Sequence, residues 1–202
     1  KKIVICGYGN MGKKYEQILK LNWPNIKLSI WRSGLKNKNI ETTSNIQFNT
    51  FENVISWKPD AAIISSPASV HLHQATLLSK CDIPLLIEKP LGMPEDSSEK
   101  FSELELRSRQ LPVLVGYILR HEPCLINIKK ILEEKKIGKI LELDLYCGSW
   151  LPEWRENLDY RDSVSSKKSL GGGALLELSH EIDLANYLFG EFKIVGANIS
   201  NS

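Results

Sequence analysis

Residues 3–12 read Ile3-Val4-Ile5-Cys6-Gly7-Tyr8-Gly9-Asn10-Met11-Gly12, an apolar run that ends in the pattern G-x-G-x-x-G. The apolar run predicts a strand and the residues after it predict a helix, the setting that a dinucleotide fingerprint requires. Gly7 suits a tight turn, Gly9 lets the backbone approach a pyrophosphate, and Gly12 lets the helix pack close to the strand. We therefore expect all six residues of this turn to bind a dinucleotide at the positive end of the helix. The alternative is a glycine-rich turn without a ligand.

The composition is that of a globular chain. Its 202 residues are 42% hydrophobic, which is enough to bury a core, and its net charge is only +2. That charge provides no basic surface for nucleic acid, and no apolar run approaches the roughly 20 residues of a membrane span. The four cysteines lie far apart, mostly in or beside apolar segments, so we expect reduced core thiols and no metal site: Cys6, Cys81, Cys124 and Cys147. We predict a cytoplasmic protein without a nucleic-acid or membrane partner.

The end of the second predicted strand bears on the choice of cofactor. A strand over 26–31 ends before Arg32 and Ser33, about 20 residues beyond the glycines. NAD sites place an acidic side chain there for the ribose 2′-hydroxyl, whereas the 2′-phosphate of NADP needs a cation and hydroxyl donors. No Asp or Glu lies between Ser33 and Glu41. We predict NADP, with NAD as the alternative; Arg32 could equally be an ordinary exposed arginine.

Strands and helices alternate along the first 117 residues. Further strands are predicted at 46–48, 60–64, 83–87 and 113–115, and helices at 13–21, from residue 50, at 70–80 and at 95–110. This order predicts an α/β fold with a doubly wound parallel sheet covered on both faces. Ligands of such sheets bind beyond the carboxyl ends of the strands. Several chemically useful residues follow those ends: Gly7, Arg32, Ser65, Ser66, Pro67, Lys89 and Tyr117.

Motifs along the chain resemble those of the Gfo/Idh/MocA oxidoreductases, the family of glucose–fructose oxidoreductase and inositol dehydrogenase. Besides residues 7–12, the resemblance rests on Ser66-Pro67-Ala68-Ser69-Val70-His71, Glu88-Lys89-Pro90, Gly116-Tyr117-Ile118-Leu119-Arg120-His121-Glu122-Pro123 and Leu170-Gly171-Gly172-Gly173-Ala174-Leu175-Leu176-Glu177-Leu178-Ser179-His180-Glu181-Ile182-Asp183. These stretches span nearly the whole chain in the order of the family. The loop before Leu170 is loosely similar to relatives in bacterial surface-polysaccharide and sialic-acid-like sugar pathways.

The resemblance implies a Rossmann domain over 1–117 and a partial α/β domain over 118–202 with an open, mainly antiparallel sheet. The second domain is expected to contain helices at 123–136 and 171–189 and strands at 139–146 and 192–199. Family members usually continue through several more strands, so we expect a truncated or unusually short member. The open sheet of the family implies a homo-oligomer, a dimer or tetramer.

The resemblance also implies roles in the chemistry. Lys89 is expected to be the catalytic lysine beside the nicotinamide, where a cation can bind a sugar hydroxyl and stabilise a developing alkoxide; the alternative is a surface lysine. His180 is expected to face the nicotinamide as general base or hydrogen-bond partner, unless it only bonds to a carboxylate. Many relatives have an aspartate four residues earlier, where this chain has Leu176. Glu177 either replaces that aspartate or orients His180, and Asp183 orients or caps.

Two further groups of residues follow from the resemblance. The cofactor site is expected to include Ser65, Ser66, Pro67, His71 and Glu88 besides Lys89, the glycine turn, Arg32 and Ser33. The substrate site is expected in the loop over 148–169, where aromatic and cationic side chains suit a sugar with a carboxylate or phosphate: Trp154, Arg155, Tyr160 and Arg161. A loop with a packed tryptophan is the alternative. Arg120 is expected to line the same pocket, or to pair with an acid and fix the domain junction.

These expectations favour an enzyme. They predict an NAD(P)-dependent oxidoreductase that transfers a hydride between a nicotinamide cofactor and a hydroxyl or ketone of a sugar or sugar derivative, with Lys89 and His180 handling the proton. The alternative is a dinucleotide-binding sensor or assembly protein whose turnover is lost through truncation. A third hypothesis is a cofactor that is recycled without dissociation, as in glucose–fructose oxidoreductase.

Overall fold

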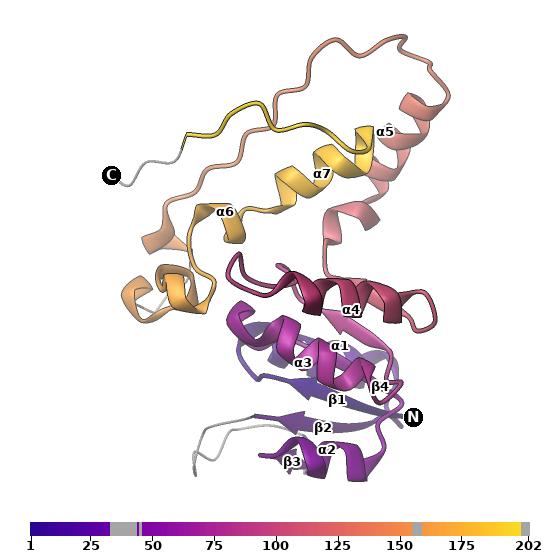
Figure 1. Ribbon diagram of the computed structural model, residues 1–202, viewed down its shortest axis with the longest axis vertical. Helices are drawn as coiled ribbons and strands as arrows, with labels where there is room; N and C mark the ends of the chain where they lie inside the picture. The colour runs from indigo at the N-terminus through magenta and orange to yellow at the C-terminus, as the bar shows by residue number, and fades with distance from the viewer. Residues whose placement is uncertain (33–43, 45, 155–158, 199–202) are drawn as a thin grey trace.

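The computed structural model of the protein describes residues 1–32, 44, 46–154 and 159–198. The first 117 residues contain a six-stranded sheet in the order β3-β2-β1-β4-β5-β6, in which all neighbouring strands are parallel (Figure 1). The strands are β1 (Lys2–Cys6), β2 (Lys27–Trp31), β3 (Gln47–Phe48), β4 (Ala61–Ile64), β5 (Leu85–Ile87) and β6 (Val113–Val115). The predicted Rossmann arrangement is therefore confirmed.

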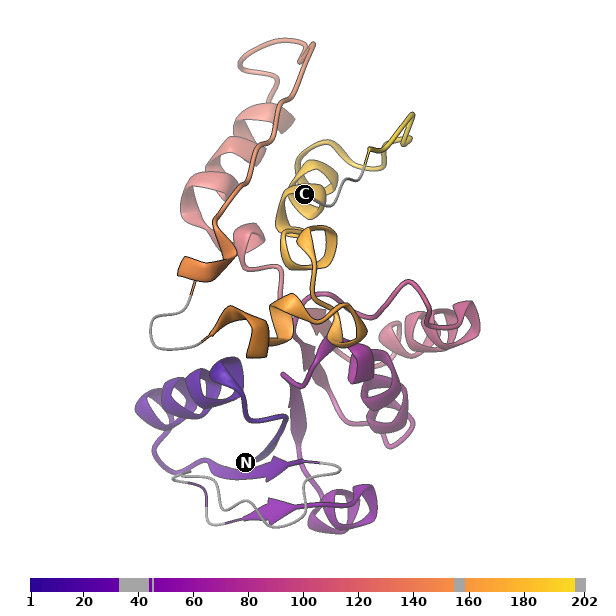
Figure 2. The same ribbon diagram turned by 90° about the vertical axis from the view of Figure 1, so that its left-hand side faces the viewer.

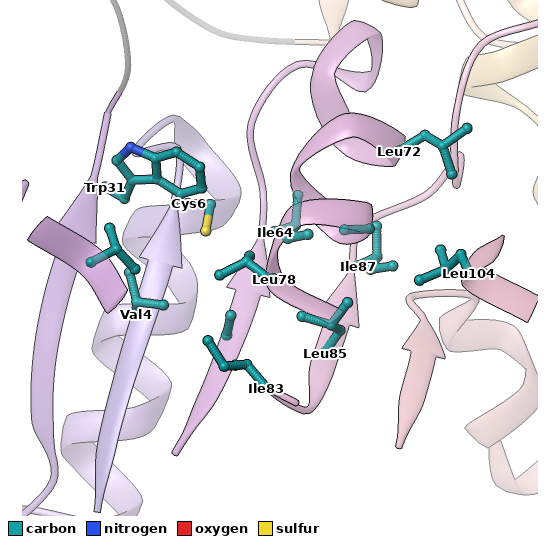
Figure 3. Close-up of a cluster of buried hydrophobic side chains, with 13 residues drawn as sticks. Val4, Cys6, Trp31, Ile64, Leu72, Leu78, Ile83, Leu85, Ile87 and Leu104 are labelled. Atoms are coloured by element: carbon teal, nitrogen blue, oxygen red, sulfur yellow. The ribbon is translucent and has the colours of Figure 1, made fainter. Parts of the chain in front are cut away.

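Helices cover both faces of the sheet, because the direction of the crossovers reverses at β1. Helix α1 (Asn10–Asn22) packs on one face, against a buried cluster that includes Ile5 and Ile30. The opposite face carries α2 (Phe51–Trp57), α3 (His71–Ser79) and α4 (Ser98–Ser108) over a larger cluster around Val4 and Ile64 (Figure 3). Val4 and Ile5 fall into different clusters because successive strand residues point to opposite faces.

The register of the strands brings their carboxyl ends to one edge. Cys6 pairs with Trp31 and with Ile64, Ile64 pairs with Ile87, and Ile87 pairs with Val115. The residues that follow these positions therefore lie at the same edge of the sheet. At β1 the order of the strands changes direction, because β2 lies on one side of β1 and β4 on the other. In doubly wound sheets this edge is the binding crevice.

In the second region, residues 118–198, the regular elements of the part that the structure describes are all helices. It contains α5 (Pro123–Glu133), α6 (Ala174–Glu177) and α7 (His180–Phe189), with single 3₁₀ turns at Ile118–His121, Leu151–Glu153, Tyr160–Asp162, Val164–Ser166 and Lys168–Leu170. Helices α5, α6 and α7 lie above α4 and the sheet in the view of Figure 1. The last three 3₁₀ turns lie between the sheet region and α6 (Figure 2).

The prediction of strands and of one long helix in this region is wrong for the described residues. Segments 139–150 and 191–198 have no assigned secondary structure, and the predicted helix at 171–189 is interrupted between Glu177 and His180. A strand exists only where a neighbour accepts its ladder hydrogen bonds. Leu141 and Val195 are accordingly exposed, to 87% and 94%. Residue 199 lies outside the described part.

The cysteines differ from expectation. Only Cys6 is buried, in β1, where burial raises the pKa of its thiol, while Cys81, Cys124 and Cys147 are exposed free thiols. The prediction of core thiols is therefore wrong for three of the four, because two of them lie in or beside segments without a covering layer and Cys81 follows the end of α3. In the described residues, no helix is long and apolar enough to cross a membrane.

Candidate active site

The glycine turn has the geometry of a phosphate-binding loop. Gly7 has a φ of +85°, and a Cβ there would lie 2.5 Å from the Ser66 backbone. A Cβ on Gly12 would lie 2.6 Å from the Gly7 carbonyl oxygen, so α1 starts in close contact with the turn. At Gly9, by contrast, a Cβ would meet nothing within 4 Å, and Gly9 supplies no side-chain cap to α1. No side chain thus caps the first N–H groups of α1, and the space beside Gly9 is open, which suits a pyrophosphate.

The residues after β4 support this turn from the side. Ser65 Oγ donates to the carbonyl oxygens of Cys6 and Gly7, at 3.2 and 3.3 Å, and Ser66 Oγ donates to Gln74 at 2.7 Å. Pro67 starts the 3₁₀ turn η1 (Ala68–Val70). The hydroxyls of Ser65 and Ser66 are therefore used within the protein, and their backbone forms the wall against which Gly7 packs.

His71 is placed differently from expectation. It is only 2% exposed, and its two ring nitrogens lie 2.8 Å from the Pro90 carbonyl oxygen and 2.7 Å from that of Ser66. Both nitrogens therefore face backbone acceptors rather than the open side of the glycine turn. The ring of His71 joins the segment after β4 to the segment after Lys89, and its place in the cofactor site stays a prediction.

Arg32 directly follows β2, next to the glycine turn. The Gly7 N–H donates to the Trp31 carbonyl oxygen at 2.9 Å, so the turn and the end of β2 are in contact. Trp31 is 4% exposed and packs against Phe51 in the larger core cluster. Ser33 lies outside the described residues, so the pair predicted to bind a 2′-phosphate is described only at Arg32.

Lys89 joins the first region to the second. It follows β5 by two residues, and its Nζ donates to the Glu177 carbonyl oxygen at 2.5 Å and lies 3.5 Å from the Glu177 carboxylate. Their side chains are 17% and 22% exposed. The structure thus brings together two of the predicted catalytic residues, with Glu177 as the immediate partner of Lys89.

His180 begins α7, three residues after Glu177. Its ring meets Tyr117 edge to face at 5.8 Å, and its Nδ1 is buried without a hydrogen-bond partner among the described residues. Burial lowers the pKa of His180, and the positive charge of Lys89 lowers it further, against smaller opposite effects of Glu181, Asp183 and Glu88. The lowered pKa favours the neutral imidazole of His180, and its Nδ1 has no hydrogen-bond partner among the described residues; a general base needs both properties.

Arg120 and Asp183 are engaged with each other. Arg120 Nε and Nη2 donate to the two Asp183 oxygens at 2.8 and 2.5 Å, and the guanidinium lies over the rings of Tyr117 and Tyr187. The hydrogen bond to Asp183 is the main reason that the pKa of Arg120 is raised. This arrangement agrees with the alternative in which Arg120 pairs with an acid, and the role of Asp183 as an orienting or capping residue stays a prediction.

The loop that was expected to bind substrate packs largely on itself. The Arg161 guanidinium lies near Asp159 and over the Tyr160 ring, while Trp154 is half-buried with an Nε1 that has no partner in the described part of the chain. Arg155 lies outside the described residues. Farther along, a Cβ on Gly171 would lie 2.5 Å from Ala68, so the end of this loop rests on the segment after β4. Trp154, Tyr160 and Arg161 are not brought to Lys89 by these contacts.

A cleft of about 580 Å³ opens next to Lys89 on the second region. Pro90 and Tyr117 line it from the first region, and Asp183 and Glu191 add charge to a wall that is otherwise largely apolar. The remaining lining residues are Leu175, Leu176, Ser179, Ile182, Asn186, Phe192 and Ile194. Elsewhere in the described residues, no group of three or more His, Cys, Asp or Glu side chains is arranged to hold a metal ion.

Sequence reasoning missed one residue of this site, Tyr15. Its hydroxyl donates to Glu88 Oε1 at 2.5 Å, across 73 positions of sequence. Burial, and then the hydrogen bond to Glu88, raise the pKa of Tyr15. The signal that points to it is its place on α1, one turn beyond Gly12, on the face that packs against the sheet.

Comparison with known proteins agrees with this geometry. Residues 1–117 match a family model described as oxidoreductase family, NAD-binding Rossmann fold, and residues 125–202 match the GFO/IDH/MocA C-terminal domain. The chain belongs to the GFO/IDH/MocA oxidoreductase family. The resemblance seen in the sequence is thereby confirmed, and the family is one that binds NAD in its Rossmann fold.

Two of the relatives are named as dehydrogenases of levoglucosan and of inositol. Levoglucosan dehydrogenase of Pseudarthrobacter phenanthrenivorans is 30% identical over 160 residues, which cover 74% of this chain and 40% of that protein. Inositol 2-dehydrogenase 2 of Saccharopolyspora erythraea is 26% identical over 132 residues, or 65% of this chain and 35% of that protein. The chain thus spans less than half the length of these relatives.

Solved structures show the same fold. The WlbA dehydrogenase from Bordetella pertussis, in complex with NADH and UDP-GlcNAcA, has a TM-score of 0.70 at 18% identity and covers 94% of this chain and 55% of its own. Levoglucosan dehydrogenase in complex with NADH has a TM-score of 0.69 at 22% identity, with coverage of 95% and 54%.

Proposed function

We propose that the protein transfers a hydride between a nicotinamide cofactor and a hydroxyl or ketone of a sugar or sugar derivative. The observation that carries the proposal is the meeting of Lys89, Glu177 and His180 at the sheet edge that bears the glycine turn. The substrate class is supported by relatives named as dehydrogenases of levoglucosan and inositol. A homo-oligomer and a cytoplasmic location stay predictions.

The charge of each group determines its role in the proposed reaction. The first turn of α1 holds the pyrophosphate, and the nicotinamide supplies hydride chemistry when the cofactor is bound. Lys89 binds the reacting oxygen of the sugar and stabilises negative charge that develops on it. His180, neutral at pH 7 because its pKa is lowered, accepts the hydroxyl proton in the oxidation direction. Glu177 holds Lys89 in place through its carbonyl oxygen.

The decisive test of this proposal is Lys89→Met. The variant keeps the length of the side chain but removes the charge, so we expect turnover to fall about 10²- to 10⁴-fold at saturating substrate, the usual contribution of an acid–base group. Lys80→Met is the control, because Lys80 is an exposed lysine at the end of α3. Its turnover should equal that of the wild type. Near-normal turnover of Lys89→Met, measured over a panel of sugars, would overturn the assignment.

NADP is the cofactor that we propose, because Arg32 is the side chain at the end of β2 and no acid accompanies it before Glu41. Arg32→Asp replaces the cation with the group that binds a ribose 2′-hydroxyl. We expect the ratio of the NADPH to the NADH dissociation constant to rise at least tenfold, measured by titration of cofactor fluorescence. An unchanged ratio would show that Arg32 does not face the 2′ position.

A binding protein without turnover is the second candidate. It is favoured by the contact between Lys89 and Glu177, which occupies the ammonium group that a substrate oxygen would need. Calorimetry with NADH and NADPH, followed by a turnover screen, separates the two functions. Binding without conversion of any sugar would support the second candidate, and native mass spectrometry of the purified protein would reveal a cofactor that stays bound.

A further inference from the structure

Tyr15 connects the helix of the glycine turn to the segment that carries Lys89. Its ring packs against the buried cluster under α1, and its hydroxyl donates to Glu88 Oε1 at 2.5 Å. Glu88 directly precedes Lys89, and its own N–H still bonds to the Ile64 carbonyl oxygen at 2.8 Å, in continuation of the sheet. One hydrogen bond therefore joins α1 to the strand end at which we place the chemistry.

The carboxylate of Glu88 lies between α1 and the site. Leu86, two residues earlier, packs in the cluster under α1, and strand residues two apart share a face, so Glu88 extends from the same face. A Cβ on Gly116, at the end of β6, would lie 3.5 Å from Glu88 Oε2, and the charge of Glu88 is among those that act on His180. The second oxygen thus lies toward the end of β6, which leads to Tyr117 beside His180, while Tyr15 holds the first.

In this pair Tyr15 is the hydrogen-bond donor and Glu88 is the acceptor. An ionised carboxylate only accepts hydrogen bonds, and the raised pKa of Tyr15 keeps its hydroxyl a donor. A glutamate side chain has three rotatable bonds, and without Tyr15 the carboxylate would have to be ordered whenever a ligand binds. A hydrogen bond to a packed, rigid ring orders it in advance.

We propose that Tyr15 is a positioning residue that holds Glu88 so that its second oxygen receives the nicotinamide half of the cofactor. This inference rests on the proposed function. The nicotinamide carboxamide and its ribose carry N–H and O–H donors, which match an acceptor-only group. The same helix therefore binds the pyrophosphate at its first turn and, through Tyr15, orients the carboxylate that receives the nicotinamide half.

The experiment compares two ligands on four proteins. The ligands are the reduced dinucleotide that binds more tightly, NADH or NADPH, and the matching ADP or 2′-phospho-ADP, which lacks the nicotinamide and its ribose. The proteins are the wild type, Tyr15→Phe, Glu88→Gln and the double variant, with Tyr146→Phe, an exposed tyrosine, as the matched control. Dissociation constants are measured by calorimetry, and circular dichroism verifies that each variant is folded.

We expect Tyr15→Phe to raise the dissociation constant of the dinucleotide about tenfold, the effect of one hydrogen bond to a charged group, and that of ADP or 2′-phospho-ADP less than twofold. In the Glu88→Gln background the same change should have less than half that effect on a logarithmic scale. Equally weakened binding of both ligands, or unchanged binding of both, would overturn this inference but not the proposed function. A wild-type protein that binds neither ligand would instead refute the proposed function.

Discussion

The two regions of the molecule differ in how they bury apolar side chains. In the sheet region, Val4, Ile5, Ile64 and Leu72 are fully inaccessible, and helices cover both faces. In residues 118–198, Leu184 is the one apolar side chain among the described residues that counts as buried, at 9% exposure. The first region therefore carries the stability, whereas the second contributes Glu177, His180 and Asp183 to the site on a much smaller core.

Two polar contacts lie near the junction of the regions. Lys89 of the first region reaches Glu177 of the second, and within the second region Arg120, close to the junction, holds Asp183 on α7. Such bonds specify a geometry more than they add free energy, because each group gives up water to form them. The site is thus assembled from a rigid half and a half whose position depends on a few directed bonds.

The largest effect is expected for a change in the core of the sheet region. Ile64→Ala removes a fully buried side chain from the central strand β4 and leaves a cavity, so the free energy of unfolding should fall by about 4 kcal/mol. Leu141→Ala, at 87% exposure in the second region, should change it by less than about 0.5 kcal/mol. Urea unfolding measures both, and similar losses at the two positions would contradict the comparison.

Two glycines with left-handed backbones provide the next test. Gly7 and Gly138 have φ values of +85° and +75°, but only at Gly7 would a Cβ collide, at 2.5 Å from the Ser66 backbone. Gly7→Ala should cost about 3 kcal/mol, from backbone strain together with overpacking. Gly138→Ala should cost about 1 kcal/mol, from strain alone. Equal losses in urea unfolding would show that the close approach at the glycine turn is not maintained.

A smaller effect is expected where the regions meet. Arg120→Lys keeps the charge but loses the two parallel hydrogen bonds to Asp183. The free energy of unfolding of the second region should therefore fall by about 1 kcal/mol. The loss is moderate because the Arg120 side chain is 39% exposed. Arg109→Lys, in an exposed pair with Glu105, is the matched control and should change nothing measurable. Hydrogen exchange of the α7 amides reports the loss locally. Unchanged exchange would mean that α7 is held by other contacts.

The sheet region could be predicted almost completely from its sequence, because the relevant signals are local. Apolar runs, the glycine pattern and the spacing of Lys89 from its strand each depend on a few neighbouring residues. The second region could not, since alternation at 139–146 indicates a strand only when a neighbour is present to pair with it. The Tyr15–Glu88 bond and the Arg120–Asp183 pair join residues 73 and 63 positions apart, which no local pattern specifies.

The last prediction concerns the effect of the Lys89 charge, in the first region, on the pKa of His180, in the second. The pKa of His180 lies below its usual 6.5, first because of burial and second because of Lys89. As the pH falls below 6.5, the unfolded chain takes up a proton at His180 before the folded chain does, so stability decreases with falling pH until the folded-state pKa is passed. A general base with this pKa also places the acid limb of the rate profile below pH 6.5.

Lys89→Met should raise the pKa of His180, because it removes the nearest positive charge but leaves the burial of the ring unchanged. NMR titration of the histidine ring protons measures this shift in the absence of cofactor and substrate, so it does not depend on turnover. Lys80→Met, which removes an equal charge far from α7, should leave the titration of His180 in place. An identical titration in wild type and Lys89→Met would show that the two regions do not hold Lys89 and His180 together in solution, and the electrostatic coupling on which the proposed base depends would be absent.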